Sequence, residues 1–302
     1  MTVLIEQPSA TGQSDPDAAG DVGRLVVSCV DGPGIVSKIS TFLHRRGANI
    51  LQSDQYSTGP RGGRFFLRIV FHLPGLPAEL AGLERAFAAE VAHPLGARFQ
   101  LRDASVPTRV ALFVSRYDHC LLDLLWRARR GELPIEVVQV VSNHADLAPE
   151  VAAFGVPFEH IPVSRATKSA AEARQLALVR GRVDLVVLAR YMQILSGGFL
   201  DTVGVPVINI HHSFLPAFAG AGPYERAKER GVKLIGATAH YATEDLDEGP
   251  IIEQDVVRVS HRVTARELTQ RGADIERAVL ARAVAWHAQD RVLVNGRTTI
   301  IF

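Results

Sequence analysis

Two polar side chains end an apolar segment in the second half of the chain. In VPVINIHHSFLPAF, residues 205–218, a β-branched run leads directly into Asn209, His211 and His212. Side chains alternate along a strand, so Asn209 and His211 share one face and His212 lies on the other. Amide and imidazole groups are costly to bury without hydrogen bonds, and one shared ligand would explain both. We therefore predict a site at Asn209 and His211, with turn capping as the alternative, and a structural role for His212.

A second candidate is the acidic loop in TEDLDEGPII, residues 243–252, where four carboxylates precede a Gly-Pro pair. A solvated surface loop is the ordinary interpretation of such a sequence. Leu246 in its middle predicts that the loop packs against the body of the protein, which would give Asp245 and Asp247 different exposures. A metal ion is not indicated, because the spacing of a calcium loop is missing and the neighbouring histidines have no HxxxH or cysteine partners.

A glycine-rich turn in DGPGIV, residues 31–36, separates a predicted strand from a predicted helix. Free backbone N–H groups at a helix N-terminus bind anions, so a carboxylate or phosphate could dock at this turn. A tight turn that needs two glycines explains the same residues equally well. The chain has no GxGxxG after a predicted strand and no Walker lysine, and VSRYDHCLL, residues 114–122, contains no glycine. A phosphate cradle at residues 114–122 is therefore disfavoured.

Composition and charge favour a small-molecule ligand. The chain has 302 residues, a net charge of +1 and 47% hydrophobic residues, as is typical of a soluble globular protein. The balanced charge provides no basic surface, so neither nucleic acid nor membrane is an expected partner. Cys29 and Cys120 lack metal-ligand spacing and are expected to be reduced, buried thiols. Without a signal sequence or a long apolar run, the chain is expected to be cytoplasmic.

The elements that must position these residues divide the chain in two. Residues 1–21 are rich in Ser, Gly, Pro and Asp and are expected to be a flexible leader. Residues 22–104 have the order βαββαβ, which is the ferredoxin-like plan. Residues 105–109 are the expected linker. Residues 110–302 alternate apolar strands with helices, which predicts an α/β domain with a largely parallel sheet covered on both faces.

The C-terminal part of the second domain departs from this alternation. Two strands are expected on either side of the acidic loop. A long helix is expected from Thr264 to about Gln289. The chain should then end in a hairpin turned by Asn295 and Gly296.

Several of these segments together resemble known families. INIHHSFLP, followed later by GATAHYATEDLDEGPII, is similar to the folate-dependent formyltransferases, and DGPGIV with RRGANI resembles an ACT domain. An ACT domain followed by a formyltransferase domain resembles the formyltetrahydrofolate deformylase family. The resemblance covers residues 25–302 and implies a Rossmann-like catalytic domain. It also implies hydrolysis of 10-formyltetrahydrofolate to formate and tetrahydrofolate, which supplies formate for purine synthesis and balances one-carbon pools.

The resemblance also assigns roles to individual residues. The family's catalytic residues match Asn209, His211 and Asp247. Attack on a formyl group creates an oxyanion, which the Asn209 amide and the His211 imidazole would stabilise. Asp247 would orient His211 and act as base toward water. No metal is implied, and no cofactor beyond the folate substrate. Folate contacts are implied for Met192, Gln193, Ile194, Leu195, Tyr241, Thr243 and Asp245.

ACT domains usually bind an amino acid and assemble edge to edge, so the resemblance implies an amino-acid effector and a homo-oligomer. A structural role of this domain in oligomerisation is an equal alternative. For the whole chain, formyl transfer to a small amine and non-catalytic amino-acid sensing stay open as alternatives. Transfer is less favoured, because SRYDHC replaces the phosphate loop of the nucleotide-making relatives. The candidate effector residues are Asp31, Gly32, Gly34, Ile35 and Asn49.

Overall fold

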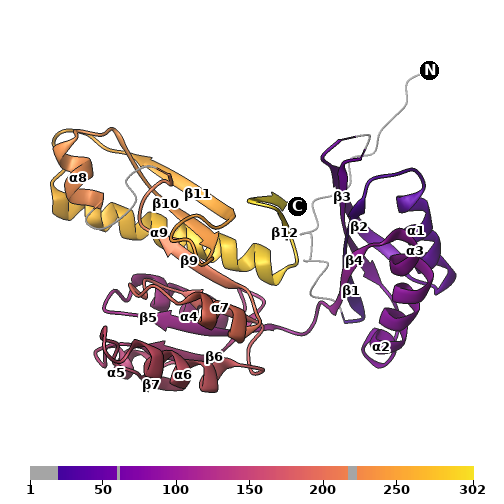
Figure 1. Ribbon diagram of the computed structural model, residues 1–302, viewed down its shortest axis with the longest axis horizontal. Coiled ribbons are helices and arrows are strands. Elements are labelled where there is room, and N and C mark those ends of the chain that lie inside the picture. Colours follow the sequence, from indigo (N-terminus) through magenta and orange to yellow (C-terminus); the bar gives the residue numbers. More distant parts are fainter. Residues whose placement is uncertain (1–19, 60–61, 217–222) are drawn as a thin grey trace, which may run out of the picture. The chain divides into compact units, whose positions relative to one another are not determined.

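The computed structural model describes residues 20–59, 62–216 and 223–302 of the chain. The chain forms two compact units that meet in sequence between Val106 and Pro107 (Figure 1). The leader expected at residues 1–21 lies outside the described residues, except for Gly20 and Asp21.

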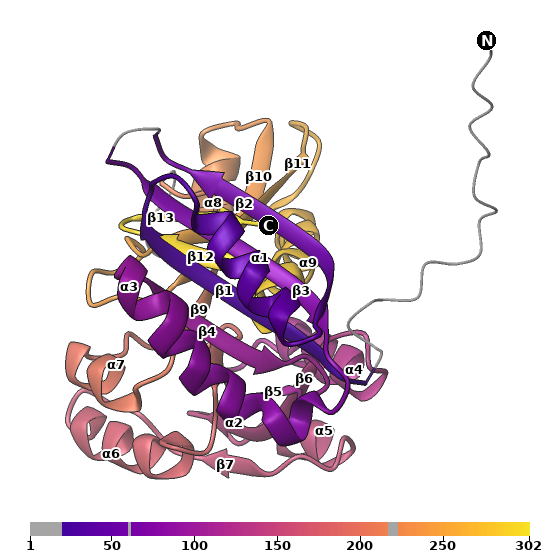
Figure 2. The same ribbon diagram turned by 90° about the vertical axis from the view of Figure 1, so that its right-hand side faces the viewer.

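The first unit is a four-stranded sheet with the order β2-β3-β1-β4, in which each paired strand runs antiparallel to its neighbour. Its helices lie together on one face of the sheet (Figure 2). The βαββαβ order predicted from the sequence is confirmed. The elements are β1 (Val22–Val30), α1 (Ile35–Arg45), β2 (Asn49–Ser57), β3 (Arg64–His72), α2 (Leu76–Phe87), the π-helical turn η2 (Ala88–Ala92), α3 (His93–Leu95) and β4 (Arg98–Asp103).

The core of the first unit follows from alternation along its strands. Leu25, Val27 and Cys29 of β1 all point to the face that the helices cover. Phe87 of α2 is 1% exposed, and its ring contacts Phe42 of α1 at a centroid distance of 5.1 Å. One apolar face of the sheet and the apolar faces of two helices thus form a core of their own.

The second unit is built on a seven-stranded sheet with the order β11-β10-β9-β8-β5-β6-β7. Strands β5 to β9 are parallel to their neighbours, whereas β10 pairs antiparallel with both β9 and β11. The largely parallel sheet is confirmed. The elements are β5 (Thr108–Val114), α4 (His119–Arg129), β6 (Ile135–Ser142), α5 (Ala148–Ala152), β7 (Phe158–His160), α6 (Lys168–Val179), β8 (Leu185–Leu188), α7 (Gly197–Val203), β9 (Val207–His211), α8 (Pro223–Glu229), β10 (Leu234–Tyr241), β11 (Ile251–Arg258), α9 (Ala265–Ala288), β12 (Val292–Asn295) and β13 (Thr298–Ile301).

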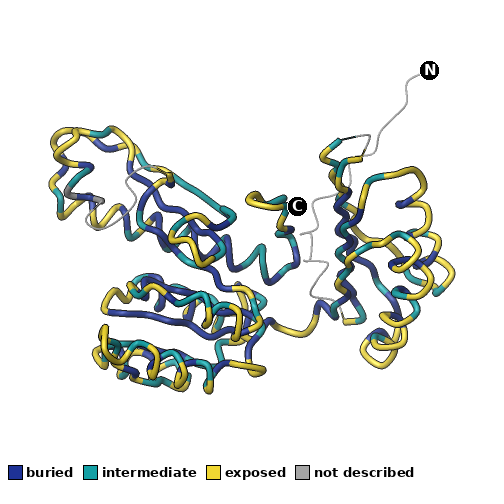
Figure 3. The backbone as a smooth tube through the Cα atoms, in the orientation of Figure 1, coloured by how far each residue is buried: buried dark blue, intermediate teal, exposed yellow. Residues whose placement is uncertain are grey.

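Both faces of this sheet are covered by helices, as its continuous apolar strands predict. Val110, Leu112 and Val114 of β5 join one core with α4 and α9. Ala111 and Phe113, the residues between them, join a second core with α6 and α7. Figure 3 shows the resulting pattern, with buried central strands and helices that expose their outer faces. Because each face of the sheet is packed into an apolar core, the ends of the strands are the place where polar functional groups are expected.

Strand β5 begins two residues before the boundary expected at Val110. The Thr108 N–H donates to the Pro134 carbonyl at 3.0 Å, and Thr108 pairs with Ile135 of β6. The sheet therefore begins within the expected linker, because the first residues after Pro107 find backbone partners on the neighbouring strand.

The long C-terminal helix α9 begins where its sequence predicts. Thr264 and Glu267 form a capping box, in which each side chain accepts a hydrogen bond from the other's backbone N–H. The hairpin β12-β13 follows, with Gly296 at φ 62° in its turn. Cys29 and Cys120 are buried and free, and burial raises the pKa of each thiol. Among the described residues, no helix is both long enough and apolar enough to cross a membrane.

Candidate active site

Strand β9 holds the polar pair at the carboxyl end of the sheet. Ile208 and Ile210 point into the core beneath α9, so Asn209 and His211 face the opposite side. His211 is 6% exposed, although its side chain is polar. Across the sheet, Asn209 lies opposite Leu188 of β8 and opposite His240 of β10. The register therefore places a histidine of a different segment directly beside the Asn209 amide.

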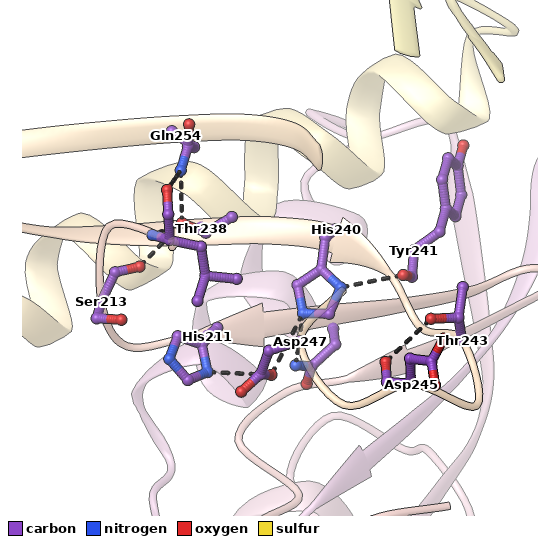
Figure 4. A network of polar contacts seen from close by, with 11 residues as sticks. His211, Ser213, Thr238, His240, Tyr241, Thr243, Asp245, Asp247 and Gln254 are labelled. Carbon is purple, nitrogen blue, oxygen red and sulfur yellow. Dashed lines mark hydrogen bonds and ion pairs between the residues drawn. The ribbon is translucent and has the colours of Figure 1, made fainter. Parts of the chain in front are cut away.

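The loop between β10 and β11 brings Asp247 to this end of β9 (Figure 4). At its base the Tyr241 N–H donates to the Pro250 carbonyl at 3.0 Å. A Cβ at Gly249 would overlap the Tyr241 carbonyl, so the loop can close this tightly only on glycine. Asp247 itself has φ 59°, in the left-handed region that Asp tolerates better than most residues. The turn directs its carboxylate at β9 instead of into solvent.

His211 and Asp247 form a buried pair. His211 Nδ1 lies 3.2 Å from Asp247 Oδ1, and the two side chains are 7% and 10% exposed. The hydrogen bond from His211 is the main cause that holds the pKa of the Asp247 carboxyl well below its usual range. The other imidazole nitrogen, Nε2 of His211, is buried and has no hydrogen-bond partner. That nitrogen is available to a group that enters the site.

His240 completes the cluster, although the sequence analysis did not select it. Its Nδ1 lies 3.0 Å from the Tyr241 carbonyl, and its Nε2 lies 3.1 Å from Asn209 Nδ2. A carbonyl only accepts, so Nδ1 carries the proton and Nε2 accepts from the Asn209 amide. Nε2 also lies 3.7 Å from Asp247 Oδ1. Only the pairing of β10 with β9 reveals this contact, because nothing in the local pattern of ATAHYAT distinguishes His240 from a buried strand residue.

The turn that follows β9 is fixed by one threonine. The Thr238 hydroxyl donates to the Ser213 carbonyl at 2.9 Å and accepts from the Leu215 N–H at 3.0 Å. The Gln254 side chain also donates to this hydroxyl, at 2.9 Å (Figure 4). Because Thr238 pairs with His211 across the strands, the backbone beside the imidazole is held in place from β10.

A pocket with a cavity volume of about 50 Å³, partly open to solvent, lies against this cluster. Asn209, His240 and Asp247 form its polar wall. Leu188 and Leu200 supply apolar surface at the bottom of the same pocket. Of the residues implied for folate binding, the pocket is lined by Gln193, Ile194, Leu195 and Thr243.

Three other residues implied for folate binding lie elsewhere. Met192 is 53% exposed and does not line the pocket, and Asp245 is exposed at the loop surface. The Tyr241 side chain points to the opposite face of the sheet, where its hydroxyl lies 2.8 Å from His287 Nδ1 of α9. The Tyr241 side chain therefore does not face the pocket, and a folate contact of this residue stays a prediction. Alternation along β10 explains this orientation, because His240 occupies the pocket face and its neighbour must occupy the other.

Leu246 also differs from its expected position. Its side chain is 57% exposed and lines the mouth of the pocket, so it does not hold the loop against the body of the protein. The expected difference between the two aspartates is nevertheless present, because the Asp247 side chain is 10% exposed whereas Asp245 is exposed at the surface. The paired histidines and the backbone of Gly249 determine that difference.

One group in the described part of the chain has donor atoms close enough to hold a metal ion, namely His119, Cys120 and Glu276. The Glu276 carboxylate is already occupied, since it accepts from His119 at 2.8 Å and from Tyr224 at 2.6 Å. The Arg190 guanidinium lies 3.4 Å from the same carboxylate. A buried cation beside the carboxylate opposes a second one, so the group suits an internal hydrogen-bond network better than a metal.

The candidate effector turn in the first unit is partly as expected. Gly34 is the N-cap of α1 at φ 84°, and no side chain caps the helix there. The Ser57 hydroxyl donates to the Asp31 carboxylate at 2.5 Å, while the Ile35 side chain is buried in the core. Asn49 does not lie near this turn. Its strand, β2, begins at the same end of the sheet as β1, since Asn49 and Val22 both pair with His72. The turn follows the opposite end of β1, which is roughly 25 Å away for the length of that strand.

Comparison with known proteins matches the two units of the chain to two different families. Residues 23–87 match the ACT domain, and residues 108–284 match the formyl transferase family. A formyltetrahydrofolate deformylase from Mycobacterium tuberculosis is 62% identical over 282 residues, which cover 93% of this chain and 91% of that protein. The chain belongs to the formyltetrahydrofolate deformylase family.

Solved structures extend this relation to the fold. The crystal structure of a formyltetrahydrofolate deformylase from Pseudomonas syringae is 44% identical, with a TM-score of 0.90 over 94% of this chain and 95% of that one. A glycinamide ribonucleotide transformylase from Symbiobacterium toebii is 32% identical, with a TM-score of 0.61 over 68% of this chain and 96% of that one. This member of the deformylase family therefore also resembles in fold an enzyme named as a glycinamide ribonucleotide transformylase.

Proposed function

We infer that this chain hydrolyses 10-formyltetrahydrofolate to formate and tetrahydrofolate. The observation that carries the inference is that Asn209 and Asp247 line one pocket and that the buried His211 imidazole is paired with Asp247 at 3.2 Å, so an amide, a carboxylate and an imidazole meet at the carboxyl end of β9. Membership of the deformylase family supplies the substrate. In the pocket, apolar residues suit the flat ring system of a folate, and the polar wall suits its formyl group.

The first step is attack of water on the formyl carbon. A carbon–oxygen bond forms, and negative charge develops on the former carbonyl oxygen. Two donors are available for this oxygen, the second N–H of the Asn209 amide and the unpartnered Nε2 of His211. Both are held in place before reaction, Asn209 by His240 and His211 by Asp247. Preorganised donors of this kind typically supply ~10²-fold or more in rate each.

Asp247 has a double role in this proposal. Its carboxylate accepts from His211 Nδ1 and offsets the charge of an imidazolium, the form in which Nε2 also donates, here to the oxyanion. Its lowered pKa makes it a weak base, so the carboxylate orients the water and takes the proton of the water only as the carbon–oxygen bond forms. In the second step the bond between the formyl carbon and N10 breaks, N10 keeps the electron pair, and that proton moves from Asp247 to N10. The products are formate and tetrahydrofolate.

Further features of the proposal concern the chain as a whole. We expect the chain to be cytoplasmic, to act as a homo-oligomer and to supply formate for purine synthesis. The uncapped N-terminus of α1 at Gly34 supports an amino-acid effector at the turn of residues 31–34, recognised through its carboxylate. No organic cofactor and no metal take part in the proposed steps.

The proposal is tested by incubation of the purified chain with 10-formyltetrahydrofolate alone, with formate and tetrahydrofolate measured over time. Equal amounts of the two products are expected without any added amine. Asp247→Asn, His211→Ala and Asn209→Ala should each lower kcat by ~10²-fold or more, because each removes a group that acts in the transition state. Product release only when an amine is present would contradict hydrolysis. Near-normal turnover in all three variants would contradict the site.

A further inference from the structure

The sheet of the catalytic unit reverses its strand order at β5, next to β8, β9 and β10, which carry residues of the pocket. The chain runs from β5 outward through β6 to β7, and then returns to β8 on the other side of β5. In open α/β sheets, ligands bind beyond the carboxyl ends of the strands where the order reverses in this way. The loop after β5 and the segment after β8 therefore border the place where a second substrate would be expected.

Side chains fill this place. Ser115 directly follows β5 and is 4% exposed, and Arg190 follows β8 and is 6% exposed. The Ser115 N–H donates to the Arg190 carbonyl at 3.2 Å, and its hydroxyl donates to Asn143 at 2.7 Å and to the Tyr191 carbonyl. These bonds join the segments that follow three neighbouring strands, β5, β6 and β8.

Glu276 lies at the centre of these buried side chains. It lies on α9 and is 1% exposed. Its carboxylate accepts from His119 at 2.8 Å and from Tyr224 at 2.6 Å, and Arg190 Nε lies 3.4 Å away. Each partner comes from a different segment, namely the start of α4, α8 and the end of β8. We call Glu276, His119, Tyr224 and Arg190 the acceptor plug.

The acceptor plug contacts the catalytic residues through His212. The His212 ring lies 5.1 Å from the His211 ring on one side and 6.1 Å from the Tyr224 ring on the other, measured between centroids. Burial and the nearby Arg190 lower the pKa of His212 to about 4, so the ring is neutral at pH 7. A continuous packed path thus leads from the plug to the imidazole that faces the formyl group.

We propose that the acceptor plug occupies the space an amine acceptor would need, so that water is the nucleophile that reaches the formyl carbon. This inference rests on the proposed hydrolysis. With the plug removed, a primary amine could attack instead. A carbon–nitrogen bond would form, the bond to N10 would break with its electron pair on N10, and the proton lost by the amine would move to N10. The product would be an N-formyl amine in place of formate.

The test measures how the formyl group divides between water and an amine. His119→Ala and Tyr224→Ala each remove one wall of the plug and leave Glu276 with two partners. Each variant is incubated with 10-formyltetrahydrofolate and glycinamide, a small primary amine, and formate and N-formylglycinamide are quantified. The ratio of N-formylglycinamide to formate should rise at least about tenfold above that of the unaltered chain. His119 is partly exposed, so its variant is expected to fold even where Tyr224→Ala does not.

Leu125→Ala is the matched control, since it creates a cavity in the same core at a residue of α4 that is not part of the plug. It should leave the ratio unchanged. A purely structural role of the plug would lower both products together and leave the ratio at the control value, which would overturn the inference. The inference would also be overturned if the unaltered chain gave the same ratio of N-formylglycinamide to formate as the two plug variants. Absence of formate from the unaltered chain would instead contradict the proposed hydrolysis.

Discussion

At the scale of single residues, the site depends on which atom each polar group binds. His240 is committed to the Tyr241 carbonyl through Nδ1, so its Nε2 accepts from Asn209 and fixes the orientation of that amide. His211 gives Nδ1 to Asp247 and retains Nε2 for a ligand. Two histidines in one cluster therefore have different tasks, and the difference follows from their partners and not from their exposure.

His212 makes the stability of the chain depend on pH. Its folded pKa of about 4 lies below the ordinary value of 6.5, so between these values the unfolded chain binds the proton and the folded chain does not. Stability is therefore full above pH 6.5 and falls as the pH decreases toward 4. The shift corresponds to about 3 kcal/mol. His212→Gln should flatten this dependence in denaturant unfolding measured across that range.

The control for this measurement is His261→Gln, which changes an exposed histidine of the same unit and should retain the dependence of the unaltered chain. If His212→Gln and His261→Gln show the same slope, burial of His212 does not set the pH dependence.

At the scale of elements, α9 connects stability to the site. It covers β9, β10 and β11 on one face of the sheet and carries Glu276. Its start and end follow from local sequence, because a capping box determines where it begins. The glycine at position 272 of this helix is explained by a tertiary contact. The Tyr224 ring lies against this position, and a Cβ there would overlap the Tyr224 hydroxyl.

Gly272→Ala should therefore destabilise the chain, although alanine favours a helix by about 1 kcal/mol over glycine. The added methyl group displaces the Tyr224 hydroxyl from Glu276. The expected result is a lower melting temperature, measured by circular dichroism. Gly82→Ala is the matched control, because Gly82 lies in α2 with open space around it and should be neutral or stabilising. Equal stabilisation by both changes would show that Tyr224 does not need the glycine.

At the scale of the whole molecule, the two units have separate cores. No residue belongs to both the core around Phe87 and the cores on either face of the larger sheet, within the described part of the chain. Each unit also has its own sheet. Separate cores imply that a cavity in one unit has little direct effect on the packing of the other.

Phe87→Ala tests this independence. Loss of a ring that is 1% exposed should cost the first unit about 3–5 kcal/mol. Hydrogen exchange followed by mass spectrometry should show faster exchange in residues 22–103, with protection in residues 108–301 and release of formate both retained. Simultaneous loss of protection in both units would show that they unfold as one.

The sequence by itself determined the features that depend on local pattern. Alternation placed Asn209 and His211 on one face, continuous apolar strands indicated a sheet covered on both sides, and caps and turns located α9 and the final hairpin. The same alternation, applied to β10, would have directed the Tyr241 side chain away from the pocket. These features are accessible because a strand repeats every two residues and a helix every 3.6, whatever surrounds them.

Only the tertiary structure decided the features that depend on which segments become neighbours. His240 lies beside Asn209 because of the β9-β10 register. Asn49 lies far from the turn of residues 31–34, because β1 and β2 begin at the same end of the sheet and the turn follows the other end. The partners of Glu276 come from segments more than forty residues away in the chain. Strand order and register are set by long-range backbone pairing and packing, and a single sequence carries no local signal for either.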